Sequence, residues 1–243
     1  MIEDFLTQLK MIGALNFYQS MKDDNLSKEQ LLTSILKSEV EWKSNNRMKR
    51  RLKTAKFPFE REWSNIEHKA NPKIPFKTVQ KLSKGKFVEG KRNLCIIGTP
   101  GLGKTHSLVS IGRDLCRIGY SVHFYTAIDL VTKLEEAKDE NRLSKLMCKL
   151  NKPHLLIIDE LGFVPLSDNG ARLLFDVFAK RYENGSIAVS TNLSLPKWSE
   201  TFGSIELTTA LIDRFTHRCD IFMYEGESYR LLESKKNMKK IKI

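Results

Sequence analysis

The sequence has few cysteines and no long apolar segment. Its four cysteines stand far apart and form no C-x-x-C pair, so the sequence supports neither a zinc site nor a redox motif. No apolar run approaches the roughly 20 residues that a membrane-spanning helix needs. The first four residues, Met-Ile-Glu-Asp, are acidic where a signal peptide would be basic. We therefore expect a cytoplasmic protein with reduced thiols and no membrane partner.

Acidic residues are scarce in three parts of the chain. Residues 43–61 contain eight Lys or Arg against one Glu, residues 68–92 repeat these counts, and residues 230–243 contain six against one. The net charge of the 243-residue chain is only +12, so the remainder is net negative. A basic surface on an acidic body is typical of proteins that bind polyanions. The hydrophobic content of 41% is sufficient for a packed core.

The first 67 residues have the apolar spacing of α-helices. Ser27 and Gln30 match a capping box, which predicts the start of a helix. The helical pattern continues to about Ala55 and stops before Pro58, because a residue that precedes proline disfavours helical geometry. Residues 68–90 contain proline, glycine and many lysines, which indicates a linker with one short helix near residues 79–82.

Strands and helices alternate from residue 93 onward. The candidate strands are residues 93–97, 122–125, 155–159, 187–191 and 220–224. This alternation predicts an α/β fold in which a five-stranded parallel sheet has helices on both faces. We therefore expect three parts: a small all-α domain over residues 1–67, a basic linker over 68–90 and an α/β domain over 91–243.

A phosphate-binding loop follows the first candidate strand. The pattern G-x-x-x-x-G-K-[ST] is matched by Gly98, Thr99, Pro100, Gly101, Leu102, Gly103, Lys104 and Thr105, and His106 follows it. The glycines let backbone N–H groups point at phosphates, and the next helix adds the positive end of its dipole. Lys104 would reach the β- and γ-phosphates, and the Thr105 hydroxyl would bind Mg²⁺. The loop predicts binding of ATP or GTP.

Two carboxylates follow a second apolar strand. Asp159 and Glu160 come directly after four apolar residues, at the end of the strand where ligands bind in open α/β sheets. Asp159 is suited to hold Mg²⁺, and Glu160 is suited to act as the general base that polarises the attacking water. A solvated acidic turn is the alternative.

Two more residues are candidates for the same chemistry. Asn192 follows the strand over residues 187–191, and it can position the attacking water if that strand lies between the loop strand and the Asp159 strand; otherwise it is a turn former. Arg214 lies in a predicted helix and could stabilise transition-state charge at a neighbouring subunit's nucleotide. The alternative for this region is a surface ion pair between Asp213 and Arg218.

A basic segment lies near the end of the long N-terminal helix. Its cations are Lys43, Arg47, Lys49, Arg50, Arg51 and Lys53. A helix of this kind can follow the phosphate backbone of duplex DNA while its apolar side packs on the body of the protein, and we expect weak sequence preference. A solvated charged helix and a helix that docks on a protein partner remain alternatives.

Together these residues resemble the IstB-like helper ATPases of insertion-sequence transposition, which are AAA+ proteins close to the DnaC helicase loaders. The resemblance covers nearly the whole chain. Beyond the phosphate loop, its more specific elements are Arg50-Arg51 with residues 55–58, residues 155–162, Arg181-Tyr182-Glu183, Trp198, residues 210–215 and Ser228-Tyr229-Arg230.

The resemblance implies a P-loop AAA+ ATPase core preceded by the all-α domain. It implies that Asn192 is sensor 1, that Arg214 is the arginine finger and that Arg230 is a candidate for the second sensor. It also implies that the protein hydrolyses ATP with Mg²⁺ and forms homo-oligomers on DNA. The partner that it implies is a cognate DDE transposase. A helicase loader that works mainly through protein docking is the alternative.

Overall fold

The computed structural model describes residues 1–21, 26–66, 71, 73–232 and 234. The chain divides into two compact units, Met1–Lys53 and Thr54–Ile243. Helix α3 (Lys28–Ala55) belongs almost wholly to the first unit and ends in the second. Each unit is described by itself below.

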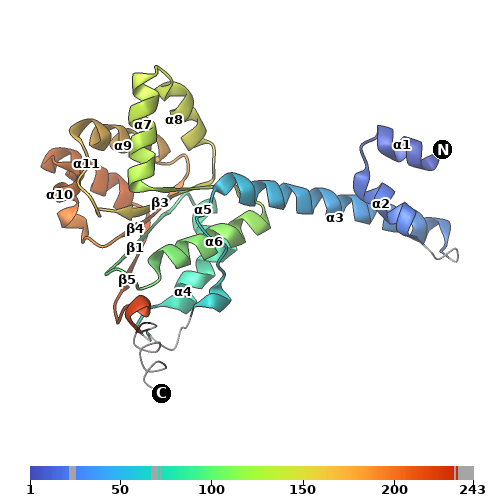
Figure 1. Ribbon diagram of the computed structural model, residues 1–243, viewed down its shortest axis with the longest axis horizontal. Coiled ribbons are helices and arrows are strands. Elements are labelled where there is room, and N and C mark those ends of the chain that lie inside the picture. The colour runs from blue at the N-terminus through green and yellow to red at the C-terminus, as the bar shows by residue number, and fades with distance from the viewer. Residues whose placement is uncertain (22–25, 67–70, 72, 233, 235–243) are drawn as a thin grey trace. The chain divides into compact units, whose positions relative to one another are not determined.

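The first unit is entirely helical. It contains α1 (Ile2–Gln8), α2 (Ile12–Ser20) and most of α3 (Figure 1). The predicted capping box is confirmed: the Gln30 N–H donates to Ser27 Oγ at 3.2 Å, and the Ser27 N–H donates to Gln30 Oε1 at 2.9 Å. The end of the long helix at Ala55 is also as predicted.

Helix α2 packs closely on α3 at Gly13. A Cβ atom at this position would lie 2.4 Å from Trp42 Cβ, so no larger residue fits without movement. Glu39 of α3 is buried beside the contact and accepts the Ala14 N–H at 3.1 Å. Burial disfavours the Glu39 charge, but this hydrogen bond and an ion pair with Lys43 at 3.1 Å outweigh burial and lower the pKa of Glu39.

The second unit is built on a parallel sheet of five strands. The strands are β1 (Asn93–Gly98), β2 (Val122–Thr126), β3 (Leu155–Leu161), β4 (Ser186–Thr191) and β5 (Cys219–Tyr224), and their order is β2-β3-β4-β1-β5 (Figure 1). All four pairings are parallel. The predicted α/β fold is therefore confirmed, and each strand lies within two residues of its predicted bounds.

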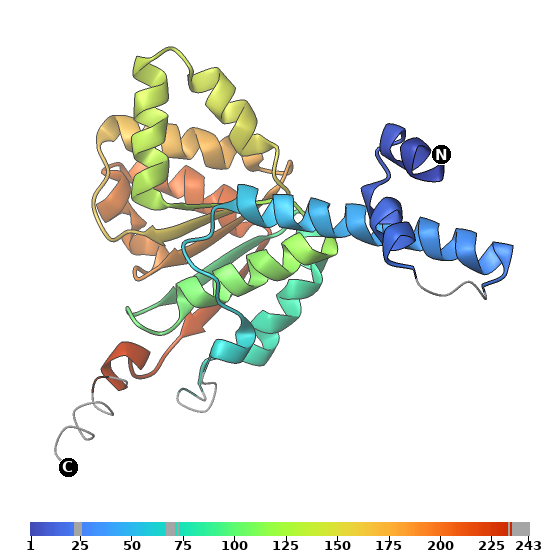
Figure 2. The ribbon, with the colours of Figure 1, turned by 45° about the vertical axis from the view of Figure 1, so that its right-hand side comes forward.

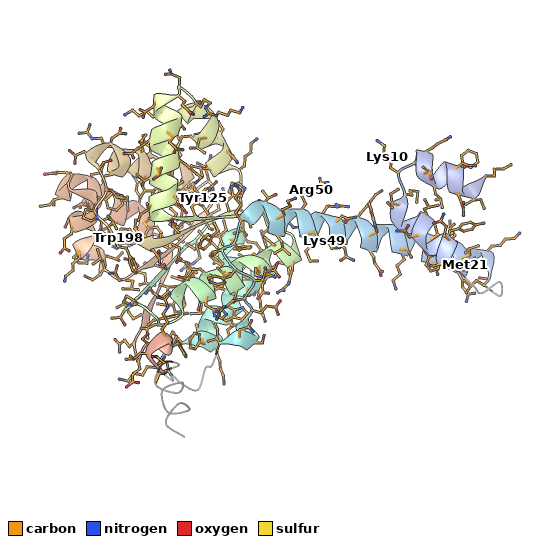
Figure 3. All side chains as sticks on the ribbon, viewed as in Figure 1. Lys10, Met21, Lys49, Arg50, Tyr125 and Trp198 are labelled. Carbon is orange, nitrogen blue, oxygen red and sulfur yellow. The ribbon has the colours of Figure 1, made fainter. Side chains whose placement is uncertain are left out.

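Helices cover both faces of the sheet (Figure 2). One side holds η1 (Trp63–Asn65), α4 (Phe76–Lys81), η3 (Leu82–Lys84), α5 (Lys86–Glu89) and α6 (Lys104–Ile118). The other side holds α7 (Ala127–Asp139), α8 (Leu143–Asn151), α9 (Asp168–Arg181), η4 (Leu195–Lys197), α10 (Trp198–Phe202) and α11 (Ile205–Thr216). Successive residues of the buried strands face opposite helical layers. Cys95 and Ile97 of β1 therefore face the same layer, and they belong to the core that includes Trp198 (Figure 3).

The described residues between α3 and β1 pack on the unit that contains the sheet. Trp63 Nε1 donates to Asp114 Oδ2 of α6 at 3.0 Å and to Ser83 Oγ at 3.1 Å. Phe76 and Val79 of α4 are buried. The unit boundary at residues 53 and 54 thus differs from the predicted boundary at 67, because lysines dominate the composition of a segment that buries its few apolar side chains. Residues 67–70 and 72 lie outside the described residues.

Arg181 of the Arg-Tyr-Glu element is a structural cation. Its side chain is 1% exposed and donates to the carbonyl oxygens of Leu150 at 2.7 Å, Pro153 at 3.0 Å and Ser186 at 2.8 Å. Burial lowers its pKa to about 10. A Cβ atom at Gly185 would lie 2.5 Å from the guanidinium, so the glycine makes room for it. Arg181 therefore joins α9 to the loop before β3 and to the start of β4.

Candidate nucleotide site

The loop over residues 98–105 joins β1 to α6 at the carboxyl edge of the sheet. Gly101 and Gly103 have φ values of +83° and +82°, a region that residues with a Cβ atom rarely adopt. Gly98 is restricted differently, since a Cβ atom there would lie 2.5 Å from the Tyr224 carbonyl oxygen. The 15-residue helix α6 begins at Lys104, so its free N–H groups and its positive dipole end adjoin the loop. This is the geometry of an anion-binding loop.

Lys104 lies inside the curl of the loop. Its side chain is buried, and Nζ donates to the carbonyl oxygens of Gly98 at 2.6 Å and Thr99 at 2.9 Å. Burial lowers the pKa of Lys104, the carboxylates of Asp159 and Glu160 act against this, and the charge of Arg230 lowers it further. The ammonium is thus placed among the groups predicted to bind phosphates and metal.

Asp159 and Thr105 come together across β3 and α6, as the sequence predicted. Thr105 Oγ1 donates to Asp159 Oδ1 at 3.1 Å, and Ser190 Oγ donates to the same carboxylate oxygen. Asp159 is 2% exposed. Burial raises its pKa, and the hydrogen bonds from Ser190 and Thr105 act in the opposite direction. The carboxylate is held by two hydroxyl groups.

The donor set at this point fits Mg²⁺. A hydroxyl and a carboxylate provide hard oxygen ligands, and Mg²⁺ usually takes one or two such protein ligands together with substrate phosphates and water. Among the described residues, no cluster of three or more His, Cys, Asp or Glu side chains forms a metal cage. Thr105 and Asp159 are therefore suited to a metal ion that arrives with a nucleotide.

Glu160 leaves the regular strand. Its φ is +60°, and the β3–β4 register is broken between Ile158 and Leu161. The Glu160 N–H donates to Ser190 Oγ at 3.0 Å, which fixes this unfavourable backbone conformation. The side chain is exposed at the carboxyl edge, next to a buried Asp159. A strained residue whose carboxylate faces solvent beside a phosphate loop has the placement that a general base needs.

Asn192 meets the topological condition set from the sequence. Strand β4 lies between β1 and β3, so its carboxyl end is next to both the loop and Asp159. The Asn192 side chain is exposed there. His106 is placed differently, because its Nε2 contacts the Glu62 carbonyl oxygen at 2.9 Å and its ring meets the edge of Phe59. The structure thus directs His106 toward the segment before α4.

Arg230 follows β5 in a turn that lies against the loop. The Tyr229 N–H donates to the Gly101 carbonyl oxygen at 2.9 Å, and the charge of Arg230 affects Lys104. The structure thus brings Arg230 to the same edge as Lys104, Asp159 and Glu160.

Arg214 lies at the opposite edge of the sheet. It is near the end of α11, where Asn93 Nδ2 at the start of β1 donates to the Phe215 carbonyl oxygen at 2.9 Å. The length of β1, six residues, separates this edge from the phosphate loop by roughly 17 Å. Arg214 is exposed, and its guanidinium carbon lies 5.3 Å from the centre of the Phe175 ring. In the described part of the chain, no ion pair joins Asp213 to Arg218.

The basic segment of α3 is largely exposed. The exposed cations are Lys43, Arg47, Lys49, Arg50 and Lys53, whereas Arg51 is half-buried. The side chains of Lys49 and Arg50 project from the helix in Figure 3. Lys43 forms an ion pair with Glu39 at 3.1 Å.

Ser190 is the residue of this site that sequence reasoning missed. Its hydroxyl donates to the Asp159 carboxylate and accepts the Glu160 N–H, so one side chain holds both acidic residues. A serine directly after the apolar residues 187–189 of β4 was the available signal. Its partners, however, follow only from the pairing of β4 with β3.

Comparison with known proteins identifies the family. Residues 5–237 match the sequence profile of the family described as IstB-like ATP binding protein. The chain belongs to this family. It is 36% identical over 211 residues to the ATP-binding protein of insertion sequence IS5376 from Geobacillus stearothermophilus, covering 87% of this chain and 84% of that protein. It is 33% identical over 239 residues to the ATP-binding protein of insertion sequence IS21 from Pseudomonas aeruginosa, covering 97% and 90%.

Solved structures share the fold of this protein. The DnaC helicase loader matches with a TM-score of 0.54 and 23% identity over 61% of this chain and 87% of that one. DnaI matches with a TM-score of 0.56 and 15% identity over 70% and 90%. The likeness confirms the predicted fold of the α/β core. Among the described helices, none has the length and apolar character needed to cross a membrane.

Proposed function

We propose that this protein is an ATP-hydrolysing switch that assembles on duplex DNA and serves the cognate DDE transposase of an insertion sequence. The observation that carries the proposal is the convergence of Lys104, Thr105, Asp159 and Glu160 at one edge of the sheet. The family supports ATP as the nucleotide. The two relatives named above are insertion-sequence proteins, which supports a role in transposition.

Hydrolysis follows from the roles that these residues are placed to take. The loop N–H groups and Lys104 bind the phosphates, and Thr105 and Asp159 would hold Mg²⁺, which neutralises charge on the β- and γ-phosphates. Glu160 accepts a proton from the attacking water, and Asn192 orients that water. Arg230 supplies a further cation on the side of Lys104. The products are ADP and phosphate.

Arg214 fits a role at the nucleotide of a neighbouring subunit. Its own phosphate loop lies at the far end of β1, so a contact within one subunit is excluded by distance. Arg214 lines a pocket together with Lys91 and Arg218. Among the described residues in its lining, Glu183 is the one carboxylate, so this surface is basic. An anionic partner such as a triphosphate bound to another copy complements it. On this basis the protein forms homo-oligomers through AAA+ interfaces.

A mixing experiment tests the role of Arg214. Arg214→Ala is expected to bind ATP like the wild type but to lose turnover on the order of 10²-fold, because the γ-phosphate it serves belongs to a neighbour. Mixing Arg214→Ala with Glu160→Gln subunits is expected to restore part of the activity, since one type of interface then has both groups intact. Arg142→Ala is the control, because this exposed arginine pairs with Glu140 between α7 and α8. No recovery at any ratio would contradict a role in trans.

The basic segment of α3 supports binding to duplex DNA. Its cations lie on successive turns of one helix, so several can contact adjacent phosphates of the backbone. Such contacts do not read bases, which is why weak sequence preference is part of the proposal. Assembly driven by ATP multiplies these contacts across subunits.

A salt series tests the DNA contact. Replacing Arg50 and Arg51 by Ala is expected to reduce the slope of log K against log salt by roughly 2 per subunit, because each lost phosphate contact lowers it by about 0.9. Binding should weaken similarly on unrelated duplex sequences, with ATP binding unchanged. The matched control removes two lysines from the exposed face of α8, Lys145→Ala with Lys149→Ala. Equal slopes for the wild type and the Arg50/Arg51 variant would reject the proposed contact.

One observation favours a second candidate function, docking on a protein such as a helicase. Leu32, Leu36 and Val40 of α3 are 59%, 48% and 67% exposed, and their spacing places them on one helix face. An apolar helix face is suited to a groove on a protein partner. Such docking depends little on salt, so the series above distinguishes it from binding to DNA.

A further inference from the structure

The chain after β5 crosses the phosphate loop. Gly226 has a φ of +145°, and the next residues approach Gly101 so closely that a Cβ atom there would lie 2.0 Å from Ser228 Oγ. The Tyr229 N–H donates to the Gly101 carbonyl oxygen at 2.9 Å. A helical turn begins at Ser228, whose carbonyl oxygen accepts the Leu232 N–H at 3.0 Å. The turn over residues 228–230 is therefore part of the wall of the nucleotide site.

A buried asparagine from a distant part of the sequence holds this turn. Asn71 Nδ2 donates to the Glu227 carbonyl oxygen at 2.8 Å, and Asn71 Oδ1 accepts the Glu227 N–H at 3.0 Å, across 156 residues of sequence. The side chain is 3% exposed. A carboxamide presents a donor and an acceptor side by side, so it pairs with one residue's backbone as a neighbouring strand would. Aspartate lacks the donor and alanine lacks both groups.

The surroundings of Asn71 make this contact specific. A Cβ atom at Gly226 would lie 2.1 Å from Asn71 Oδ1, so the glycine allows the amide to approach. On the other side, the Ile74 N–H donates to the Asn71 carbonyl oxygen at 3.2 Å, and the Phe76 ring packs edge-on against Tyr224 at the end of β5. Both segments that the amide joins are thus anchored to the sheet.

We propose that Asn71 is a positioning residue of the nucleotide site, which fixes the turn over residues 228–230 on the phosphate loop and so directs Arg230 toward the phosphates. The side-chain hydrogen bonds of Asn71 go to Glu227, and on this proposal Asn71 does not contact the nucleotide. It acts through a backbone segment whose Tyr229 N–H contacts Gly101. The inference rests on the proposed function, because Arg230 is assigned there to the bound nucleotide.

The first measurement follows the turn itself and needs no nucleotide. In the Asn71→Ala variant of the full chain, hydrogen exchange over residues 225–232 is expected to accelerate at least about tenfold, because the Glu227 backbone loses its two hydrogen bonds with Asn71. Asn71→Asp keeps the size of the side chain and is expected to release the turn as well, which covers the case in which the alanine variant folds poorly. Asn184→Ala is the matched control, since this exposed asparagine donates to the carbonyl oxygens of Lys180 in the last turn of α9 and of Tyr182 directly after it.

The second measurement is the dissociation constant for Mg²⁺–ATP. We expect about a tenfold increase in Asn71→Ala and a similar increase in Arg230→Ala, because a misplaced group loses its contact. The variant with both changes should bind no more weakly than Arg230→Ala alone, since the two residues act on one contact. A purely structural role of Asn71 would instead multiply the two effects.

The outcomes separate this inference from the proposed function. Wild-type exchange over residues 225–232 in both Asn71 variants, or multiplied effects on ATP affinity, would overturn the positioning role. A wild-type protein that does not bind ATP, together with a turn released by both Asn71 variants, would overturn the proposed function while the anchoring by Asn71 stands. Both are supported if exchange over residues 225–232 accelerates, Asn71→Ala weakens ATP binding, and the double variant binds ATP no more weakly than Arg230→Ala alone.

Discussion

The Lys104→Ala variant is expected to bind ATP on the order of 10²-fold more weakly than the wild type. Lys104 is the cation enclosed by the phosphate loop, and a hydrogen bond to a charged group contributes about 1.5–3 kcal/mol, with each 1.4 kcal/mol worth a factor of ten in affinity. Alanine removes the charge, and the loop N–H groups that remain bind the phosphates without it. The measurement is equilibrium titration with labelled ATP in the presence of Mg²⁺.

The control for this prediction is Lys145→Ala, which removes an exposed lysine from α8. Circular dichroism establishes that both variants are folded. If Lys104→Ala and Lys145→Ala bind ATP with wild-type affinity, the loop is not the nucleotide site.

The Glu160→Gln variant is expected to lose turnover by about 10²-fold or more while still binding Mg²⁺–ATP. Glutamine preserves the size of the side chain and the backbone N–H that Ser190 accepts, so the strained geometry survives and only the proton acceptor is removed. ATP-dependent assemblies should persist, because the bound nucleotide is not consumed. Steady-state release of phosphate at saturating ATP measures this loss.

Glu136→Gln provides the comparison. Glu136 is exposed on α7, so this substitution makes the same chemical change away from the loop. It should retain wild-type turnover. Wild-type turnover in Glu160→Gln would mean that another group activates the water.

The placement of residues that belong to a local sequence pattern could be predicted. The loop over 98–105 needs glycines, Lys104 and Thr105 in a fixed spacing, and Asp159 and Glu160 are marked by the apolar strand before them. The strands themselves were predicted because parallel strands buried on both faces are continuous apolar runs. In these cases the pattern lies within a few consecutive residues, so no knowledge of the tertiary fold is needed.

Residues whose partners are distant in sequence could not be predicted. Ser190 holds Asp159 and Glu160 only because β4 pairs with β3, and Asn71 pairs with a residue 156 positions away. The packing of residues 54–66 on α6 was missed for a related reason: Trp63 finds Asp114 only in the folded unit. Arg181 was recognised as part of a motif, but its burial depends on carbonyl oxygens from two separate segments.

On the proposal that Arg214 serves a neighbour's nucleotide, the opposite placement of the phosphate loop and Arg214 determines how copies of this chain associate. A contact that joins the carboxyl edge of one sheet to the amino edge of the next uses two different surfaces, so it is head-to-tail and not two-fold symmetric. Such a contact gives a ring where the rotation closes and an open helical filament where it does not. In an open filament, the subunit at one end has a loop that no Arg214 reaches. The filament then contains one fewer complete site than subunits, so activity per subunit rises with its length.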